Sequence, residues 1–424
     1  MPALCSIRER PFAERALLER GGAGQQRGRL PDTKRCDMVQ RRIRTAALFA
    51  GAAALGMLLA GCSAPGANKG ANATDSSGPI KIAIVDAQSG QLSSLGDWEA
   101  KGAKMAFDEQ NAAGGIDGRK IVYTVYDDQG DPTTSTNLAN KLASDGNIAM
   151  IGTAESADSL AMAPIMAQNK IPMITSGQSP KLGELHNSFV FLNSPSSTAY
   201  DETLAKYLVN DKGYTSIAMI SNNGAYGAGE RDAFKASLKD LSVSPAADQV
   251  VTPDQKDFSS ALTQIRGKNP KVLFIGAEEV ETGLIVKQAR QLGIDAVIAG
   301  GAPAGTPVYV KTAGIDNAEG TIVSTPYLGN DTNDQTKKFA ADYKAKYNET
   351  GELHGAKAYD GAKILIQALQ NSKVATGQAL SDAIRAVKYD GLVGHFDFDE
   401  NGIGVHETQI GEIDQDGNLV AANG

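Results

Sequence analysis

From Pro79 onward, short runs of consecutive aliphatic residues alternate with segments of helical periodicity. The runs expected to form strands are Ile80–Val85, Ile121–Tyr126, Ile148–Ile151, Ile171–Thr175, Ile217–Ile220, Gln249–Val251, Val272–Ile275 and Ala296–Ala299. Most of these runs are aliphatic without interruption, which indicates strands buried on both faces, as in parallel sheets covered by helices. The sequence therefore predicts an α/β fold built from mostly parallel sheets with helices on both faces.

The alternation falls into two series that are separated near Ser194–Thr198, and 424 residues are enough for two hydrophobic cores. After the second series, helices are expected at Asn333–Glu349 and Ala356–Asn371. An antiparallel pair is expected from His395–Phe398 and Glu407–Ile413. A two-lobed protein whose chain crosses between the lobes several times is suited to hinge around a ligand held between them.

The segment Ile148–Leu182 reads as strand, polar loop, helix, strand and second polar loop. The two strands of such a unit lie parallel, so both loops meet at the carboxyl edge of the sheet, where ligands bind in open α/β sheets. These loops contain Ser156, Ser159, Ser176 and Ser179, whose hydroxyl groups and neighbouring N–H groups suit a small carboxylate. The alternative is that the serines only cap helices and fill turns.

The charge of the chain is unevenly distributed. Of 41 Lys and Arg and 49 Asp and Glu residues, the first 61 positions contain 11 and 5, which leaves a net charge of −14 for the rest. A surface this acidic argues against a nucleic-acid partner.

The first 61 residues resemble a processing segment. Arg41, Arg42 and Arg44 precede the apolar stretch Thr45–Leu59, as in an export signal that starts at Met38. The stretch ends in Leu-Ala-Gly-Cys at 59–62, which resembles the lipobox of bacterial lipoproteins and implies that Cys62 is acylated. The alternative is a signal anchor, although 15 residues are short for a membrane span.

Three consequences follow for the N-terminal organisation. Residues 1–37 are expected to be an extension upstream of the true start, and residues 38–61 the signal peptide. Cys5 and Cys36 lie in that extension, so the mature chain retains Cys62 alone and has no disulfide. Residues 62–78 are small and polar and are expected to tether the domain flexibly to its lipid.

No catalytic motif is found, so we expect neither an enzyme nor a cofactor. The four histidines, expected on the surface, are scattered and show no HExxH pattern. Asp397–Gly402 matches the opening of a calcium loop, but Thr408 stands where the twelfth-position Glu would be. A tight hairpin turn explains this stretch without metal.

From about Pro79 to the C-terminus, a series of short motifs occurs in a fixed order. They are Ser89-Gly90 with Gly96-Asp97, Asn111-Ala-Ala-Gly-Gly-Ile-Asp-Gly, Tyr126-Asp-Asp, Asp131-Pro132, Ile171-Pro-Met-Ile, Tyr226-Gly227, Asp257-Phe-Ser, Lys287-Gln-Ala-Arg, Ala358-Tyr-Asp and Phe398-Asp-Glu-Asn-Gly. Because these motifs occur in this order, the chain resembles the type I periplasmic binding proteins, specifically the leucine/isoleucine/valine-binding branch that serves ABC importers. The resemblance implies an N-lobe of residues 79–197 plus 327–390 and a C-lobe of 198–326 plus 391–424, joined by three hinge crossings.

The resemblance also implies a ligand site. A small amino acid, aliphatic by the family pattern, would place its carboxylate at Ser156, Gly177 and Ser179 and its ammonium at Glu281, with Tyr226 closing over it. The implied protein is a monomer outside the cytoplasm, anchored to the membrane through Cys62 and delivering its ligand to a permease. The alternative for the Glu run at 278–281 is a solvated helix start.

Two departures from the family pattern stand out. The family's early disulfide is missing, because Gly130 and Glu155 occupy its positions, and Leu95 replaces an aromatic residue that often contacts the ligand. The second departure leaves the ligand's identity open. The alternatives to amino-acid import are an extracytoplasmic sensor of the same fold and an importer subunit for an aromatic acid or an amide.

If Cys62 is the site of lipid attachment, Cys62→Ser will leave an unlipidated precursor. Labelled palmitate fed to the producing cells should appear in the parent chain and not in the variant. Label in the Cys62→Ser protein would contradict the prediction.

Overall fold

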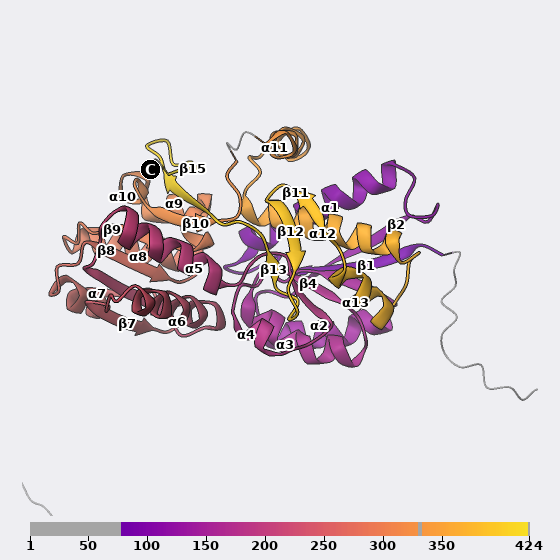
Figure 1. Ribbon diagram of the computed structural model, residues 1–424, viewed down its shortest axis with the longest axis horizontal. Coiled ribbons are helices and arrows are strands. Elements are labelled where there is room, and N and C mark those ends of the chain that lie inside the picture. Colours follow the sequence, from indigo (N-terminus) through magenta and orange to yellow (C-terminus); the bar gives the residue numbers. More distant parts are fainter. Residues whose placement is uncertain (1–77, 330–332, 423–424) are drawn as a thin grey trace, which may run out of the picture. The chain divides into compact units, whose positions relative to one another are not determined.

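The computed structural model describes residues 78–329 and 333–422, which belong to one compact unit spanning Asn72–Gly424. The expectations for the upstream extension, the signal peptide, Cys62 and most of the tether fall outside the described residues. The described chain forms two lobes, each with its own sheet, which confirms the predicted fold class (Figure 1).

The first lobe is built on a five-stranded parallel sheet with the strand order β2-β1-β3-β4-β5. Its strands are β1 (Ile80–Asp86), β2 (Ile121–Asp127), β3 (Ala149–Ile151), β4 (Met173–Thr175) and β5 (Val190–Leu192). The helices between them are α1 (Ser93–Ala112), α2 (Pro132–Ser144), α3 (Ser156–Gln168) and α4 (Lys181–Glu184). Later in the chain, α11 (Asp334–Tyr347), α12 (Leu353–Asn371) and α13 (Gln378–Arg385) return to this lobe.

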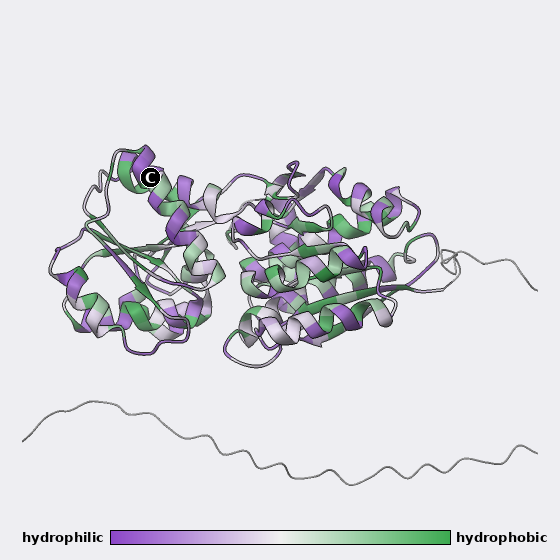
Figure 2. Ribbon diagram, turned by 90° about the horizontal axis from the view of Figure 1, so that it is seen from below, coloured by the Kyte–Doolittle hydropathy of each residue, from purple (hydrophilic) through white to green (hydrophobic). Residues whose placement is uncertain are grey.

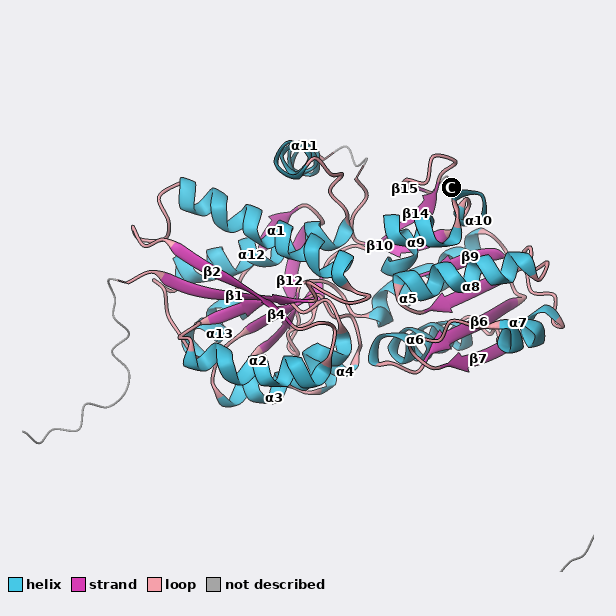
Figure 3. Cartoon of the chain, turned by 180° about the vertical axis from the view of Figure 1, so that it is seen from behind, coloured by secondary structure: helices cyan, strands magenta, loops and turns pink. Residues whose placement is uncertain are grey.

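The packing of β1 explains why its sequence is aliphatic without interruption from Ile82 to Val85. Ile80, Ile82 and Ile84 pack into a core with residues of α1 and α12. Ala83 and Val85 point to the opposite face, into a core with residues of α2 and α3. Successive side chains of a strand alternate between faces, so a sheet that is covered on both faces needs apolar residues at every position. Figure 3 shows the helices on both sides of the strands.

The second lobe contains a seven-stranded sheet with the order β15-β14-β10-β9-β8-β6-β7. Its strands are β6 (Ile217–Asn222), β7 (Ala247–Val251), β8 (Val272–Gly276), β9 (Val297–Gly300), β10 (Ile322–Thr325), β14 (Gln409–Ile413) and β15 (Leu419–Ala421). Its helical segments are α5 (Ser197–Lys206) with the π-helical turn Tyr207–Asp211, α6 (Ala225–Asp240), α7 (Ser259–Arg266), α8 (Glu279–Gln291), the 3-10 turn Ala302–Gly305, α9 (Pro307–Ala313) and α10 (Ile315–Ala318).

The central strands of this sheet are also apolar on both faces. On β8, Leu273 and Ile275 belong to one core, and Val272 and Phe274 belong to the other. The hydropathy colouring of Figure 2 shows strands of this lobe as largely hydrophobic, while purple segments are common on the helices around them. The physical rule that predicted parallel sheets therefore applies to both lobes.

The last passage of the chain between the lobes comes later than the expected position, residue 391. Strand β11 (Tyr389–Gly391) pairs with β12 (Gly394–Phe398), and β12 pairs with β13 (Gly404–Val405), all in antiparallel fashion. Phe396 is buried in the first lobe's core, and the Phe398 ring packs edge-on against Phe191 with centroids 5.2 Å apart. The gain from burying these rings keeps residues 391–405 on the first lobe.

The expected pairing of His395–Phe398 with Glu407–Ile413 is wrong, because the burial of Phe396 and Phe398 keeps the first of these strands on the first lobe. The turn at residues 399–402 forms, but it joins β12 to β13, whereas β14 pairs with β10 and β15. Asp399 closes this turn, because its Oδ1 accepts hydrogen bonds from the N–H groups of Asn401 and Ile403 at 2.8 Å each. The calcium-like motif thus forms a hairpin turn.

Within the described residues, the chain passes between the lobes three times. The passages lie between β5 and α5, between β10 and α11, and between β13 and β14. Ser194 and Ser196 of the first passage are buried. The carboxyl ends of β3 and β4 lead into loops that contact the second lobe, where a side chain added at Gly229 of α6 would bring its Cβ within 3.3 Å of Ser179 Oγ.

We predict that Phe396→Ala will destabilise the folded protein by about 3–5 kcal/mol, because it leaves a cavity in the first lobe's core. Val405→Ala in the adjoining strand is the matched control, since Val405 is 52% exposed and a surface change typically costs about 0.5 kcal/mol or less. Urea unfolding followed by circular dichroism measures both. Equal urea midpoints for Phe396→Ala and Val405→Ala would contradict the assignment of β12 to the first lobe.

Candidate ligand site between the lobes

Two loops at the carboxyl edge of the first sheet are tied together by a serine. Ser156 lies in the first turn of α3, directly after the loop that follows β3, and is 1% exposed. Its Oγ accepts hydrogen bonds from the N–H groups of Gln178 and Ser179, which follow β4, at 3.2 Å each. This confirms that the folded chain brings the two predicted loops together.

Behind this contact, hydroxyl groups form a short chain. Ser159 Oγ lies 2.6 Å from Thr175 Oγ1 and 3.0 Å from Thr153 Oγ1. Gly177 donates its N–H to Thr175 Oγ1 at 3.0 Å, and a Cβ at this position would lie only 3.1–3.3 Å from Leu182, Ser159 and Ser156. Close packing therefore favours glycine here, since a side chain would have to displace these neighbours by a few tenths of an ångström. Ser159 has a structural role, as in the alternative in which the serines only stabilise loops and turns.

Ser179 differs from these serines. It is fully buried, and its Oγ has no hydrogen-bond partner among the described residues. A buried hydroxyl group without a partner costs about 1–3 kcal/mol. This hydroxyl lies at the junction with α6, close to Gly229.

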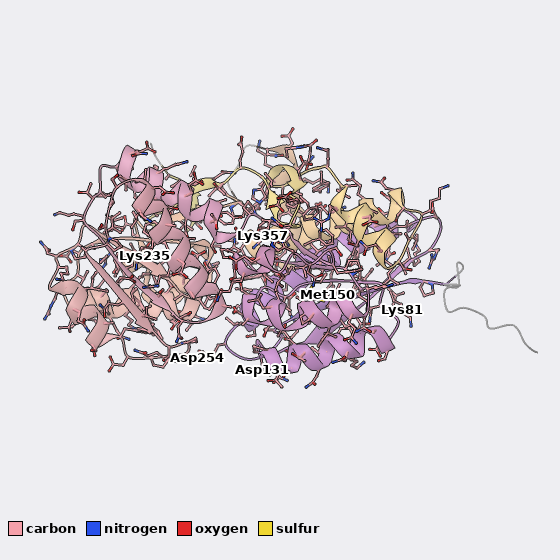
Figure 4. The ribbon with its side chains drawn as sticks, turned by 60° about the horizontal axis from the view of Figure 1, so that its bottom comes forward. Lys81, Asp131, Met150, Lys235, Asp254 and Lys357 are labelled. Carbon is pink, nitrogen blue, oxygen red and sulfur yellow. The ribbon has the colours of Figure 1, made fainter. Side chains whose placement is uncertain are left out.

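A buried lysine fixes the second loop from behind. Lys357 of α12 is 1% exposed and donates from Nζ to the Ser176 carbonyl at 3.0 Å (Figure 4). Burial lowers the pKa of Lys357 to about 8, although the nearby Glu99 opposes this shift. One turn away, His354 is 5% exposed and lies 2.9 Å from Glu352 Oε2, so the expectation that all histidines are on the surface is wrong for this one.

The second lobe contributes a tyrosine and a glutamate at the start of α6. Tyr226 is 6% exposed, and its hydroxyl forms a hydrogen bond with Glu230, whose carboxyl also bonds Ser197. Burial raises the pKa of Glu230 to about 7 and moves the pKa of Tyr226 well above its usual value. A side chain at Gly301 would clash with both groups, since its Cβ would lie 2.4 Å from Glu230 Oε2 and 2.7 Å from the Tyr226 hydroxyl.

Glu281 lies in the first turn of α8 and is 7% exposed. Its Oε2 accepts a hydrogen bond from Asn222 Nδ2 at 2.6 Å, while its Oε1 has no partner among the described residues. Burial raises its pKa to about 7. Its neighbour Glu279 is fully buried and Glu278 is half-buried, so the solvated helix start that was the alternative for this run is excluded.

A cavity of about 370 Å³ opens between the lobes. Glu281 lines it, together with neighbours of two other predicted site residues. Glu155 and Ala157 flank Ser156, and Ala225 precedes Tyr226. Ser156, Gly177, Ser179 and Tyr226 are not among its lining residues, so the cavity lies next to the buried donors and does not contain them.

The mouth of the cavity is bridged by a glutamine that sequence analysis missed. Gln91 donates from Nε2 to Asp254 Oδ1 and accepts at Oε1 from Lys256 Nζ at 2.6 Å. Figure 4 labels Asp254 on the second lobe and Asp131 on the first, beside the lining residue Pro132. Exposed polar residues on loops give no periodic signal, so only the folded chain places these side chains together.

Glu155 and Glu278 were also missed as site residues. They line the same cavity from opposite lobes, and their carboxyl groups form a hydrogen bond with each other. The family comparison had placed Glu155 only as the position of an absent cysteine; Gly130, the other such position, lines the cavity as well. The run at 278–281 held the signal, because solvent-facing helix starts need far fewer acids than three in four residues.

Among the described residues, no group of three His, Cys, Asp or Glu side chains is arranged to hold a metal ion. Within the same part of the chain, no helix has the length and apolar character needed to cross a membrane. The chemistry of the site thus consists of neutral donors on the first lobe and carboxyl acceptors from both lobes.

The comparisons with known proteins agree with this architecture. Residues 79–418 match the family model described as periplasmic binding protein. The Leu/Ile/Val-binding protein BraC3 of Rhizobium johnstonii is 29% identical over 308 residues, which cover 72% of this chain and 83% of that protein.

Two solved structures are similar to the chain at 25% identity and a TM-score of 0.76, each covering 81% of it. One is the substrate-binding protein LivJ of Streptococcus pneumoniae in complex with isoleucine, 99% of which is covered. The other is the leucine-binding protein LivK of Thermotoga maritima, 98% of which is covered.

The raised pKa of Glu281 predicts a pH-dependent difference in stability. Because the folded state holds this proton more tightly than the unfolded state, its free energy of unfolding falls as pH rises from about 4.5 to about 7. Glu281→Gln retains an acceptor for Asn222, and because glutamine does not ionise, the variant does not lose this stability as pH rises. The variant should therefore match the parent at pH 4.5 and melt higher at pH 8.

Glu319→Gln is the control, because Glu319 is exposed on the second lobe. Thermal melts of both variants and the parent across this pH range, without added ligand, provide the measurement. A difference that is constant with pH would show that Glu281 ionises normally in the folded protein.

Proposed function

The chain belongs to the periplasmic binding protein family, and from that premise we propose that it is the lipid-anchored solute-binding subunit of an ABC importer and binds a small α-amino acid between its lobes. Its relatives bear the names of Leu/Ile/Val-binding proteins, and it is a solute-binding protein of the branched-chain amino acid transporter type. We propose three further points: the lipid anchor, the role as a subunit of an ABC importer, and the α-amino acid as ligand.

One observation carries the ligand proposal. A hydroxyl donor on the first lobe, Ser179, and a carboxyl acceptor on the second, Glu281 Oε1, are both buried near the junction without a partner among the described residues. An α-amino acid carries a carboxylate and an ammonium on one carbon, so it offers a partner for each. Charged hydrogen bonds of this kind contribute about 1.5–3 kcal/mol each.

The two loops of the first lobe supply the carboxylate side of the proposed site. Ser156 Oγ accepts from two backbone N–H groups, and an entering carboxylate would take over those donors together with the Ser179 hydroxyl. Gly177 would contribute its N–H by giving up the bond to Thr175. Tyr226 would cover the ligand from α6.

A ligand that contacts both lobes stabilises their closed arrangement, because its binding energy is available only when the lobes meet. Gln91, which joins Asp254 and Lys256 across the mouth, adds contacts that exist only in that arrangement. Leu92, Pro132 and Val280 supply apolar lining for the ligand's side chain, and this is compatible with the aliphatic class that the relatives' names suggest.

The proposed lipid on Cys62 serves delivery. A domain tethered by a short flexible linker stays near its permease at a high effective concentration. The protein would act as a monomer outside the cytoplasm, and release to the permease would follow opening of the lobes.

A thermal-shift screen against amino acids, amines, simple carboxylates and sugars tests this function. A ligand at 100 times its dissociation constant adds about 2.7 kcal/mol of stability, so we expect an α-amino acid to raise the melting temperature clearly. Ser179→Ala and Glu281→Ala should each weaken its binding by about 10- to 100-fold, since each removes a charged hydrogen bond.

Glu319→Ala is the control and should bind like the parent. Melting shifts produced only by compounds without an ammonium group, such as aromatic acids or polyols, would overturn the amino-acid proposal. Unchanged binding by Glu281→Ala would remove Glu281 from the site while leaving the ligand class intact.

A further inference from the structure

The cavity between the lobes holds more carboxyl groups than one ammonium group could balance if all of them were ionised. Four carboxylic residues line it: Glu155, Asp254, Glu278 and Glu281. The one cationic side chain in its lining, Lys256, hydrogen-bonds Gln91 at the mouth and lies beside Asp254. If the charge of Lys256 is counted against that of Asp254, which both bond Gln91, three carboxyl groups remain for the interior.

Two of these three face each other across the lobes. Glu155 comes from the loop before α3 and Glu278 from the N-cap position of α8, and they share a hydrogen bond. A hydrogen bond between two carboxyl groups requires a proton on one of them. Glu155 also accepts from the Ala157 N–H at 3.2 Å, which favours its ionised form and places the proton on Glu278.

The surroundings of this pair are acidic on every side. The carboxyl groups facing the pair belong to Asp128, Asp158, Glu279 and Glu281, which act on it from the loop after β2, from α3 and from α8. Burial raises the pKa of both Glu155 and Glu278, and the charge of Glu155 raises that of Glu278 further. Charged groups of the same sign this close are stable together only with bound protons or cations.

The third carboxyl group shows that the cavity is built for a ligand. Glu281 is 7% exposed and lines the cavity, and its Oε1 has no partner among the described residues. A buried acceptor without a hydrogen bond lowers the stability of the folded protein, and a ligand that donates a hydrogen bond to it removes this cost. Under the proposed function, the α-ammonium of the ligand meets this oxygen.

We propose that the ligand carries a second cationic group, which binds between Glu155 and Glu278, so that the preferred amino acids are those with an amino or guanidino side chain. This inference rests on the proposed function and specifies its ligand. The side-chain cation displaces the shared proton of the pair, which passes to solvent, so one proton is released for each ligand bound. Leu92, Ala225 and Val280 provide apolar contacts for the methylene groups between the two ends.

An aliphatic amino acid would leave the pair protonated and the second cation missing. Binding of a cationic ligand should therefore strengthen as pH rises, since deprotonating Glu278 becomes easier, whereas binding of leucine should not depend on this proton. This difference separates the two ligand classes without knowledge of the natural ligand.

Titration calorimetry on the purified protein provides the test, with ornithine, lysine and arginine against leucine and valine. We expect at least one cationic amino acid to bind about tenfold or more tightly than leucine, which corresponds to about 1.4 kcal/mol. Repeating the titration in buffers of different ionisation enthalpy should show about one more proton released for the cationic ligand than for leucine, by the exchange described above.

Glu278→Gln and Glu155→Gln provide the matched variants, with Glu319→Gln as the exposed control and thermal melts to verify folding. Each of the first two should weaken the cationic ligand by about tenfold or more, and by more than it weakens leucine, whereas the exposed control should bind both like the parent. Leucine or valine binding more tightly than every cationic amino acid would overturn the inference, as would full cationic affinity in both variants.

Failure of the proposed function gives a different result. If no amino acid binds, that function is wrong, and putrescine and agmatine then test the cationic subsite alone. Binding of either diamine that is lost in Glu278→Gln supports the subsite without the amino-acid proposal. If neither binds, the subsite is also rejected.

Discussion

Buried carboxyl groups at the junction of the two lobes impose the strongest constraint on this protein. Glu155, Glu278 and Glu281 lie at one cavity, and Glu230 lies close by beside Tyr226. Taking an ionised carboxylate out of water is costly, so these groups must be protonated or bind donors. Their raised pKa values follow from burial first, and for Glu278 repulsion by Glu155 raises the pKa further. The closed arrangement of the lobes depends on how this charge is compensated.

The first lobe has the complementary character. Its loops present hydroxyl and N–H donors that are held by neutral contacts, with Ser156 joining the loops and Lys357 fixing the second loop through the Ser176 carbonyl. The backbone around these donors is already ordered before an anion arrives, so binding would exchange hydrogen bonds without ordering the loops, which lowers the entropic cost of binding. The acidic second lobe and the donor-rich edge of the first thus favour a molecule with separated charges of both signs.

The positions of these groups depend on backbone topology more than on any single side chain. Parallel strands place the ends of β3 and β4 at one edge, and the N-termini of α6 and α8 follow strands of the other sheet in the same way. The late return of the chain after β13 leaves β12 buried against the first lobe through Phe396. The third passage between the lobes consequently lies between Val405 and Gln409.

The sequence by itself determined the class of fold and the two loops, because uninterrupted aliphatic runs such as Val272–Ile275 are stable only in a sheet covered on both faces. It also indicated Ser156, Gly177 and Ser179 as neighbours. Only the tertiary structure decided that Ser179 lacks a partner among the described residues while Ser159 has two, because the neighbours of a buried hydroxyl are set by how the loops pack. The same holds for Glu155 and Glu278, which are more than a hundred positions apart. Local periodicity carries no information about two loops that meet across lobes, so the proximity of these carboxyl groups is apparent only in the folded chain.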